Sequence, residues 1–430
     1  MKRHLIGIGG VGMSALATAL VRLGDEVTGA DRTLGTPNIR FLESLGVKVY
    51  PDDGSGVDEA TDEVIVSTAI EESNPGLAKA KALGIPVTHR AKALARTLSG
   101  YKLVAVVGTC GKSTVTAMLG HVLAECGLDP MCVNGANVPG WEGAVRFGKG
   151  EYAVAEVDES DKSLVAFSPS AAIVTNASAD HYSKEEMDAV FDAFVKDCPG
   201  PVIDGRDQGS GSGDQGAEWV TPLPGKHNLQ NAALAAKMAL ALGCKAEDVK
   251  RALASFRGVE RRLQRILPDP NTQTPPNPNT QTPTHPNTSP AVYDDYAHNP
   301  EKLKAMWTTV AEAHPAGICV VWRPHGYAPL RKMLEPLAAM FDETIRPCDK
   351  LLLLPVYDAG GTTDRSINSD ALKEKVEKTG GDGERIVLVS DLDAAFDWCA
   401  AHRGDFAAFV TCGARDPGLP VLARRIAELG

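Results

Sequence analysis

The sequence predicts an α/β protein of three domains, each built on a largely parallel β-sheet. Short runs of β-branched and small apolar residues alternate with helical patterns along most of the chain, which is typical of successive β–α–β units. Two of these runs end in glycine-rich turns that lead into helices, at residues 7–12 and 108–111. An imperfect repeat of Pro, Asn and Thr occupies residues 268–290. We therefore expect domains at 1–98, 99–266 and 291–430, with a low-complexity loop at 267–290.

Bulk composition excludes several classes of protein. The chain of 430 residues is 43% hydrophobic and 23% charged, as in ordinary globular proteins. A formal net charge of −11 argues against a general binder of nucleic acid or of anionic membranes. The nine cysteines form no C-x-x-C pair, which fits reduced thiols better than disulfides or a zinc site. With neither a signal-peptide pattern nor a membrane-length apolar run, we expect a cytoplasmic protein of unknown oligomeric state.

The first strand–turn–helix unit has the pattern of a nucleotide-binding loop. Its turn contains four glycines in the pattern G-x-G-G-x-G: Gly7, Gly9, Gly10 and Gly12. Such glycines let the backbone approach a diphosphate closely. A second strand at 26–30 leads to Asp31, where a carboxylate would meet a ribose hydroxyl. NAD or a UDP-sugar would satisfy this geometry, and a glycine turn without a ligand is the alternative. Further strands are expected at 63–68 and 85–87, and helices at 76–83 and 90–99.

The second glycine-rich turn, within residues 104–114, has the pattern of a phosphate-binding loop. A buried strand ends at Gly108, and Gly-Lys-Ser-Thr precedes a helix expected at 113–126. Backbone N–H groups and the helix dipole favour an anion at such a turn. Lys112 would neutralise nucleotide phosphates, and the Ser113 hydroxyl would complete the shell of a magnesium ion. The spacing Gly-x-x-Gly-Lys-Ser is shorter than the usual pattern, and a turn with an incidental lysine is the alternative.

Acidic side chains follow the next strand, at 151–156. Four carboxylates lie within residues 156–161, and burying them together would require a cation. Beside a phosphate-binding loop we expect Mg²⁺, with Glu156 as a ligand; an exposed acidic turn is the alternative. After a further strand at 171–176, His181 either holds a second metal or caps a loop.

The end of the central region is less regular. Residues 198–222 are expected to form a flexible loop because the periodic pattern thins there. A helix at 226–242 then begins with Asn228 and Asn231 on one face, where amide groups could read an adenine edge. Capping of the helix N-terminus is the alternative.

The third domain repeats the alternation of strands and helices. Strands are expected at 291–293, 317–322, 351–355, 386–389 and 406–410, and helices at 300–313, 329–341, 392–402 and 417–429. The loops 323–325 and 357–365 follow strands, at the sheet edge where ligands bind in such domains.

Several motifs occur in one order along the chain. They are His4-Leu-Ile-Gly-Ile-Gly-Gly-Val-Gly-Met-Ser, Gly108-Thr-Cys-Gly-Lys-Ser-Thr, Glu156-Val-Asp-Glu-Ser-Asp, Thr175-Asn, Asp180-His, His227-Asn-Leu-Gln-Asn, Arg261-Arg and Asp294-Asp-Tyr-Ala-His-Asn-Pro. This set resembles the Mur ligases of peptidoglycan precursor synthesis over nearly the whole chain. The resemblance implies an ATP-dependent enzyme that adds an amino acid, by default L-alanine, to the carboxylate of UDP-N-acetylmuramate through an acyl phosphate.

The resemblance also implies roles for individual residues. Catalysis would depend on Lys112, Glu156 and His181, and Mg²⁺ would be held by Ser113, Glu156 and His181. ATP would be bound by Gly108, Thr109, Gly111, Lys112, Ser113, Thr114, Asn228, Asn231, Arg262 and Asp295. The UDP-sugar would contact Gly9, Gly10, Gly12, Met13, Ser14, Asp31 and Ser67, and the amine side would involve His298, His325 and Arg365.

The chain departs from the family pattern mainly in the third domain. Gly326 and Pro329 stand where the family usually has two arginines, which would touch the acyl phosphate and the carboxylate of the incoming amino acid. Losing two cations from an anion site is not conservative, and Arg323, Arg331 and Arg365 are candidates to replace them. Cys110 also replaces the usual His of the phosphate-binding loop. Two alternatives stay open: a paralogue using another amino acid or a peptide, and a non-catalytic paralogue that binds a nucleotide or UDP-sugar.

Overall fold

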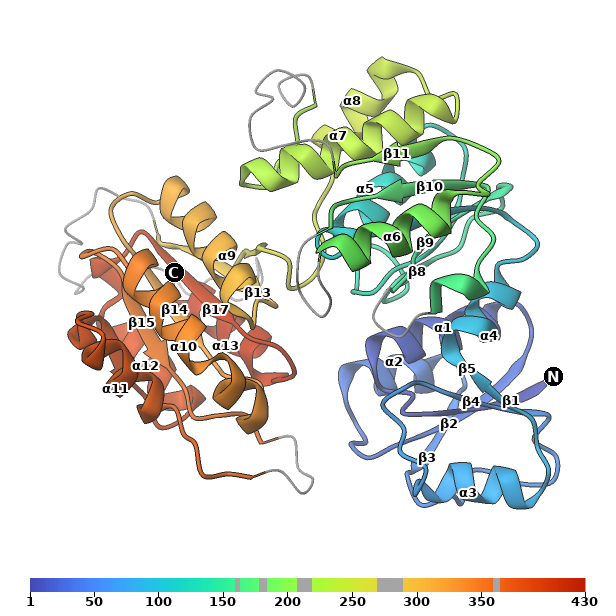
Figure 1. Ribbon diagram of the computed structural model, residues 1–430, viewed down its shortest axis with the longest axis horizontal. Helices are drawn as coiled ribbons and strands as arrows, with labels where there is room; N and C mark the ends of the chain where they lie inside the picture. The colour runs from blue at the N-terminus through green and yellow to red at the C-terminus, as the bar shows by residue number, and fades with distance from the viewer. Residues whose placement is uncertain (159–162, 178–183, 207–218, 269–288, 359–363, 430) are drawn as a thin grey trace. The chain divides into compact units, whose positions relative to one another are not determined.

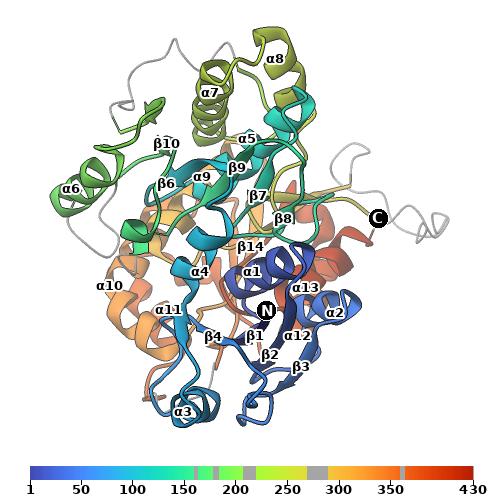
Figure 2. The same ribbon diagram turned by 90° about the vertical axis from the view of Figure 1, so that its right-hand side faces the viewer.

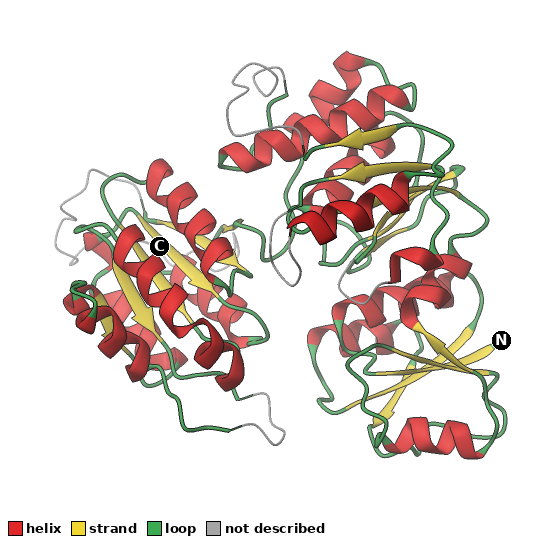
Figure 3. Ribbon diagram, in the orientation of Figure 1, coloured by secondary structure: helices red, strands yellow, loops and turns green. Residues whose placement is uncertain are grey.

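The computed structural model contains three β-sheets with helices packed on their faces (Figures 1 and 3). It describes residues 1–158, 163–177, 184–206, 219–268, 289–358 and 364–429. The chain separates into two compact units, Met1–Leu223 with His227–Val259, and Pro224–Lys226 with Glu260–Gly430. The predicted α/β class with three sheets is confirmed.

The first sheet has five parallel strands in the order β3-β2-β1-β4-β5. Its strands are β1 (Lys2–Ile6), β2 (Glu26–Asp31), β3 (Lys48–Pro51), β4 (Glu63–Val66) and β5 (Val87–His89), and its helices are α1 (Val11–Arg22), α2 (Pro37–Ser44), α3 (Pro75–Ala82) and α4 (Arg90–Thr97). Strand order reverses between β1 and β4, and ligands bind at such a reversal in open parallel sheets. The glycine turn after β1 therefore lies where a nucleotide is expected.

The second sheet has six strands in the order β11-β10-β6-β9-β7-β8, of which only β8 is antiparallel to its neighbour. Its strands are β6 (Lys102–Val107), β7 (Met131–Val133), β8 (Val145–Arg146), β9 (Tyr152–Glu156), β10 (Ala171–Val174) and β11 (Val202–Asp204), and its helices are α5 (Lys112–Glu125), α6 (Lys184–Val195), α7 (Lys226–Ala241) and α8 (Ala246–Ala254). Helices α7 and α8 lie side by side (Figure 2), and α8 packs on α5. The phosphate-binding turn follows β6, with β10 and β9 as its flanking strands.

One hydrophobic core joins the first two sheets. It contains strand residues of both, such as Leu5 and Ile65 from the first sheet and Ala105 and Ala155 from the second, together with apolar side chains of α1 and α4. Burying this apolar surface is worth roughly 25 cal/mol per Å². The shared core explains why the two sheets form one compact unit.

The third sheet has six strands in the order β12-β13-β17-β14-β15-β16, and β12 is antiparallel to β13. Its strands are β12 (Gln264–Ile266), β13 (Ala291–Asp295), β14 (Ile318–Trp322), β15 (Lys350–Leu353), β16 (Ile386–Leu388) and β17 (Ala408–Cys412), and its helices are α9 (Pro300–Ala313), α10 (Tyr327–Thr344), α11 (Asp370–Lys378), α12 (Leu392–Ala401) and α13 (Gly418–Ala427). Successive residues of β14 enter different cores: Val320 packs with α9, α10 and α11, whereas Cys319 and Val321 pack with α12 and α13. This alternation shows that helices cover both faces.

The structure differs from the sequence prediction in a few segments. Residues 202–204 form the edge strand β11, although a loop was expected across 198–222. The last strand of the first sheet lies at 87–89 rather than 85–87. Helix α10 runs from Tyr327 to Thr344 instead of 329–341. It begins before Pro329 because a proline is tolerated in the first turn of a helix. Helices α2, α6, α8 and α11 were not predicted.

The predicted end of the central domain also differs from the grouping in the structure. Residues 260–266 belong to the C-terminal unit, where β12 adds an antiparallel edge strand to β13. The boundary at 98/99 and the low-complexity loop at 267–290, most of which lies outside the described residues, stay predictions.

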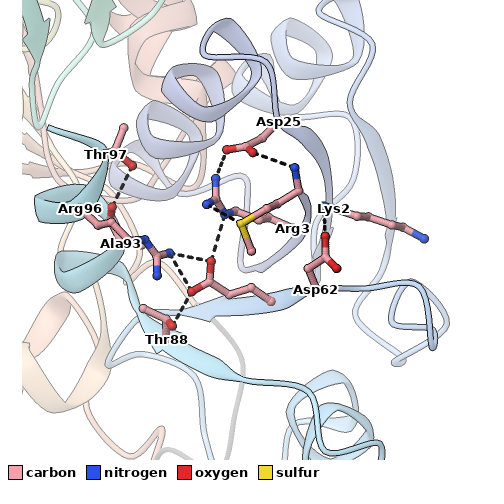
Figure 4. Close-up of polar contacts among 10 residues, drawn as sticks. Lys2, Arg3, Asp25, Asp62, Thr88, Ala93, Arg96 and Thr97 are labelled. Atoms are coloured by element: carbon pink, nitrogen blue, oxygen red, sulfur yellow. Dashed lines mark hydrogen bonds and ion pairs between the residues drawn. The ribbon is translucent and has the colours of Figure 1, made fainter. Parts of the chain in front are cut away.

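A buried ion-pair network fixes α4 to the first sheet (Figure 4). The Glu63 side chain is only 4% exposed and accepts a hydrogen bond from Arg3 Nε at 3.0 Å. Arg96 Nη2 of α4 donates to both Glu63 oxygens, at 2.8 and 2.6 Å, and Thr88 Oγ1 donates at 2.5 Å. Arg3 pairs in turn with Asp25. Burial tends to raise the pKa of Glu63, but the hydrogen bonds from Arg96, Thr88 and Arg3 outweigh it and lower that pKa.

We predict that Glu63→Gln lowers the free energy of unfolding by about 3 kcal/mol, because removing one member of a buried pair leaves the other charges uncompensated. The folded-state pKa of Glu63 lies below its unfolded value of about 4.3. The stabilisation is therefore present above that unfolded value and is lost as the pH falls through the folded pKa. Urea unfolding of both proteins between pH 3 and 7 should show the difference shrinking on acidification.

An exposed ion pair provides the control for this prediction. Asp393 pairs with Arg425 at 2.7 Å, and their side chains are 82% and 39% exposed. Asp393→Asn should change stability by less than about 1 kcal/mol. An equal effect of the two substitutions would contradict the role given to Glu63.

Candidate active site

The phosphate-binding turn connects β6 to α5. Gly108 has φ 133° and Gly111, the N-cap of α5, has φ 82°, and both values favour glycine. A Cβ atom on Gly108 would lie 2.1 Å from Thr175 Oγ1, so only glycine fits. Ser113 and Thr114 are buried in the first turn of α5. The amide groups of this helix N-terminus can therefore serve a phosphate.

Two residues that follow β10 hold this turn in place. Strand β10 pairs in parallel with β6, with Val174 opposite Val107, so the residues after both strands meet at one sheet edge. Asn176 Oδ1 accepts hydrogen bonds from Thr109 Oγ1 at 2.6 Å and from Cys110 N at 2.9 Å. Asn176 Nδ2 and Thr175 Oγ1 both donate to the carbonyl oxygen of Cys110, at 3.0 and 2.6 Å. The turn is thus fixed before any phosphate binds.

Thr175 and Asn176 stand in the sequence only as part of a motif, and no role was predicted for either residue. The available signal was their position: both are polar and end the strand expected at 171–176, in the same domain as the phosphate-binding turn. What was missing was the knowledge that β10 is the immediate neighbour of β6.

Lys112 is positioned by the turn that it follows. Its Nζ donates a 2.6 Å hydrogen bond to the carbonyl oxygen of Gly108, which places the ammonium group over the turn. Lysine is a compact point charge that can exchange such a contact for a phosphate oxygen. The predicted role of Lys112 toward nucleotide phosphates fits this position.

Glu156 ends β9, on the other side of β6. The register places it opposite Val106, one residue before the last residue of β6. Its Oε2 accepts a hydrogen bond of 2.8 Å from the N–H of Gly135, and a Cβ on residue 135 would lie 2.5 Å from that oxygen. Gly135 is therefore required for the position of the carboxylate. Its role could not be predicted from the sequence because it depends on Glu156, 21 residues away.

The predicted magnesium site is only partly covered by the structure. Glu156 and Ser113 are hard oxygen donors of the kind that Mg²⁺ prefers, and both lie at the β6–α5 turn or on the strand beside it. His181 lies outside the described residues. Within the described part of the chain, no group of three or more His, Cys, Asp or Glu side chains could hold a metal ion. The donor chemistry fits, and the ligand assignment stays a prediction.

Asn228 and Asn231 lie close to the phosphate-binding turn. Both are buried in α7, and Asn231 Nδ2 donates to Asn228 Oδ1 at 3.3 Å. A Cβ on Gly111 would lie 2.8 Å from Asn231 Oδ1, so this amide packs directly on the turn. The structure thus places both asparagines near the nucleotide loop, while their contact with adenine stays a prediction.

The glycine turn of the first domain is held by two polar side chains. Asp31 Oδ2 accepts from the N–H of Gly9 at 2.9 Å, and Asn38 Nδ2 donates to the carbonyl oxygen of Gly9 at 2.9 Å. Asp31 Oδ1 also accepts from the N–H of Thr33 at 2.9 Å. Asp31, whose carboxylate is predicted to contact a ribose hydroxyl, therefore also stabilises the glycine turn.

The other residues predicted to contact the UDP-sugar surround this turn. Gly10 is the N-cap of α1 and Gly12 lies in its first turn. Met13 and Ser14 are buried, and Ser14 Oγ donates to the Val11 carbonyl at 3.1 Å. Ser67 follows β4, the strand beside β1. The structure gathers these residues at one sheet edge, and their ligand contacts stay predictions.

Arg262 and Asp295 lie together in the C-terminal unit. Asp295 ends β13, and its carboxylate accepts from the N–H groups of Leu263 and Ala297, each at 2.7 Å. Burial raises the pKa of Asp295, and the charge of Arg262 opposes that shift. The Arg262 guanidinium lies over the Tyr296 ring, 5.4 Å from its centroid. Both residues are thus placed by local contacts, and their contact with ATP stays a prediction.

His298 and His325 meet at the carboxyl edge of the third sheet. Their ring centroids are 4.8 Å apart in an edge-to-face arrangement. Burial first, and then the nearby positive groups His298, Arg415 and Lys302, lower the pKa of His325 to about 4. His325 is therefore neutral at pH 7.

The arginines considered as replacements for the missing cations are already paired. Arg323 Nη1 lies 2.8 Å from Asp416, Arg331 Nη2 lies 2.9 Å from Asp364, and Arg365 Nε lies 2.7 Å from Asp358. Arg365 also lies over the Tyr327 ring, at 5.9 Å from its centroid. Each guanidinium has a partner within the domain, so recruiting one for a substrate would mean rearranging an ion pair.

Comparison with known proteins identifies the class of enzyme. The model of the Mur ligase family catalytic domain matches residues 2–102, and the model of the Mur ligase glutamate ligase domain matches residues 284–415. The chain belongs to the Mur ligase family and is an ATP-dependent carboxylate–amine ligase.

The names of individual relatives are more specific than the descriptions of the two family models. The chain is 30% identical to UDP-N-acetylmuramate–L-alanine ligases of Rhizobium etli, across 95% of this chain and 93% of that protein, and of Gloeobacter violaceus, across 98% and 95%. The crystal structure of UDP-N-acetylmuramate–alanine ligase from Thermotoga maritima superposes with a TM-score of 0.78 at 25% identity, covering 100% of this chain and 98% of that one. In the described residues, no helix has the length and apolar character needed to cross a membrane.

We predict that Asn176→Ala raises the KM for ATP about tenfold, because the N–H and carbonyl groups of Cys110 lose the partner that fixes the turn. Steady-state kinetics with varied ATP would measure this. Asn74→Ala is the matched control: it removes the N-cap of α3 and should cost about 1 kcal/mol of stability without changing the KM for ATP. An unchanged KM in the Asn176 variant would contradict the anchoring role.

Proposed function

We propose that this protein adds an amino acid, with L-alanine as the default, to the carboxylate of UDP-N-acetylmuramate at the expense of ATP. The observation that carries the proposal is the phosphate-binding turn held by Thr175 and Asn176, with Lys112 over it and Glu156 on the neighbouring strand. Full-length similarity to ligases named for this reaction supports the choice of substrates.

The reaction has two steps in this proposal. A carboxylate oxygen of UDP-N-acetylmuramate attacks the γ-phosphorus of ATP, which gives an acyl phosphate and ADP. The amino group then attacks the acyl carbon, and inorganic phosphate leaves as the amide forms. Phosphoryl transfer depends mainly on positioning and charge neutralisation. Lys112 and the N–H groups at the start of α5 would supply both to the transferred phosphoryl group.

Ser113, Glu156 and His181 would hold Mg²⁺, in keeping with the oxygen donors of the first two. When bound, the ion would neutralise charge on the β- and γ-phosphates. The chain's own contribution is to keep Glu156 directed at this position through the N–H of Gly135. Asn228, Asn231, Arg262 and Asp295 are the further residues proposed to contact ATP.

The first domain would hold the nucleotide part of UDP-N-acetylmuramate. The glycine turn after β1 is fixed by Asp31 and Asn38, and its helix α1 has no side-chain cap at Gly10. An anion is favoured at such an uncapped N-terminus. Because both substrates are nucleotides of the cell interior, we propose a cytoplasmic location.

The chain departs most from the family pattern at the residues expected to bind the amino acid. His298, His325 and Arg365 are proposed to lie on the amine side, but Gly326 and Pro329 provide no cation, and Arg365 is paired with Asp358. A different amino acid or a peptide is therefore the second candidate for the amine substrate. Both candidates require the same first step.

The test is phosphate release from ATP with UDP-N-acetylmuramate and each amino acid in turn. We expect release that depends on the amino acid and a matching amide product. Lys112→Ala should lower kcat/KM about 10³-fold, because a cation that stabilises the transferred phosphoryl group is lost. Lys102→Ala, which removes an exposed lysine at the start of β6, is the matched control and should keep full activity.

The outcomes separate the candidates. Turnover with one amino acid other than L-alanine would replace the default amine and keep the ligase reaction. A protein that binds nucleotides tightly but turns over with no amino acid or peptide would contradict the proposed reaction and favour a binding role.

A further inference from the structure

Two cysteines of the second sheet's helices lie together at the end of α5 opposite the phosphate-binding turn. Cys126 is the C-cap of α5, and Cys244 lies in the turn between α7 and α8. Both side chains are half-buried against the same hydrophobic core, and their thiols are hydrogen-bonded to each other. The two sulfur atoms are thus in contact without being bonded.

The packing of α8 on α5 brings the two thiols together. His121 Nε2, a little more than one turn before Cys126, lies 3.0 Å from the carbonyl oxygen of Ala252 and 3.0 Å from Ser255 Oγ, at the C-terminal end of α8. Cys244 precedes the N-terminal end of the same helix. The two helices therefore run antiparallel, with the His121 contact at one end of their interface and the thiol contact at the other.

Backbone hydrogen bonds hold both cysteines in place. The N–H of Cys126 donates to the carbonyl oxygen of Val122 at 2.9 Å, and that of Cys244 donates to Ala239 at 3.0 Å. Gly243, with φ 94°, ends α7 in the left-handed conformation that is usual after a helix. Because the thiols are already in contact, joining them requires rotation of side chains rather than movement of either helix.

The two thiols differ in how easily they ionise. Burial raises the pKa of Cys126, and it raises the pKa of Cys244 to about 12. Their mutual hydrogen bond lowers the pKa of Cys126 and raises that of Cys244, so Cys126 ionises first. Among the charged neighbours of Cys126, Asp248 and Glu125 raise its pKa and Arg251 lowers it. Because the thiolate is the nucleophile, reaction begins at Cys126 and becomes faster as the pH rises.

We propose that Cys126 and Cys244 form a redox modification site, which a low-molecular-weight disulfide such as oxidised glutathione converts into an intramolecular disulfide. The Cys126 thiolate attacks one sulfur of oxidised glutathione, and one glutathione thiolate leaves. The Cys244 thiolate then attacks the Cys126 sulfur, and the second glutathione thiolate leaves. The protein gives up two protons and two electrons, which reduce oxidised glutathione to two thiols.

The disulfide joins two helices that begin at the nucleotide site. Lys112 is the first residue of α5, and Asn228 lies in the first turn of α7. Residues 126 and 244 are 118 positions apart in the chain, so the bond removes much conformational freedom from the unfolded state. Oxidation therefore stabilises the folded protein, and the phosphate-binding turn at the other end of α5 keeps its position. This inference does not depend on the proposed reaction.

Incubating the full chain with oxidised glutathione at about pH 8.5, where more thiolate is present, tests the proposal. After the remaining thiols are alkylated, mass spectrometry of a tryptic digest should find the peptides that contain residues 126 and 244 joined by a disulfide. The midpoint of thermal unfolding should rise by about 5–10 °C, and dithiothreitol should reverse both changes.

Three variants make the test specific. Cys126→Ser and Cys244→Ser should each remove the linked peptide and the rise in the unfolding midpoint. Cys348→Ser removes an exposed thiol of the C-terminal unit and is the matched control. It should form the linked peptide to the same extent as the wild type.

The wild-type protein alone can contradict the inference. Cysteines 126 and 244 that both stay unmodified, or that carry glutathione without becoming linked, would show that the thiols are not placed to join. A linked pair formed together with a fall in the unfolding midpoint would show that the helices must move to form the bond, which would contradict the arrangement described above.

Discussion

The hydrogen bonds between Asn176 and the backbone of Cys110 are the constraint on which the active site depends. They join the residues after two neighbouring parallel strands, β6 and β10, so the sheet itself sets the shape of the phosphate-binding turn. They also explain how the turn accommodates Cys110, where the family usually has His. Asn176 contacts the N–H and carbonyl groups of residue 110, and these groups are the same for any side chain. The position of the turn therefore depends little on what residue 110 carries.

The first domain uses the same solution with different residues. Its glycine turn is held at Gly9 by the carboxylate of Asp31 and the amide of Asn38, which contact the N–H and the carbonyl group of that one residue. In both domains a polar side chain from a neighbouring element fixes a glycine-rich turn before a helix. A turn that is already rigid without a ligand loses less conformational entropy when the ligand binds. Because one core joins the two sheets, the two nucleotide sites belong to a single compact unit.

Much of the fold, and the position of both glycine-rich turns, could be predicted from the sequence because parallel α/β units leave strong local signals. The β6–α5 turn, the first glycine turn and the positions of most strands along the chain follow from apolar runs, glycines and helical periodicity. Short elements such as β11 and β12 were missed or misjudged, since three residues carry no period. The roles of Asn176 and Gly135 could not be predicted, because they depend on partners 66 and 21 residues away that only the strand order brings close. The ion pairs of Arg323 with Asp416 and of Arg331 with Asp364 could not be predicted for the same reason.

The central claim is that the anchored turn delivers the γ-phosphoryl group of ATP to a substrate carboxylate. Transfer of isotope from that carboxylate measures this step directly. With UDP-N-acetylmuramate carrying ¹⁸O in its carboxylate, and with the amino acid that supports turnover, the phosphate released should contain one ¹⁸O atom for each amide formed. Amide formation with unlabelled phosphate would contradict the acyl phosphate and the role assigned to the turn.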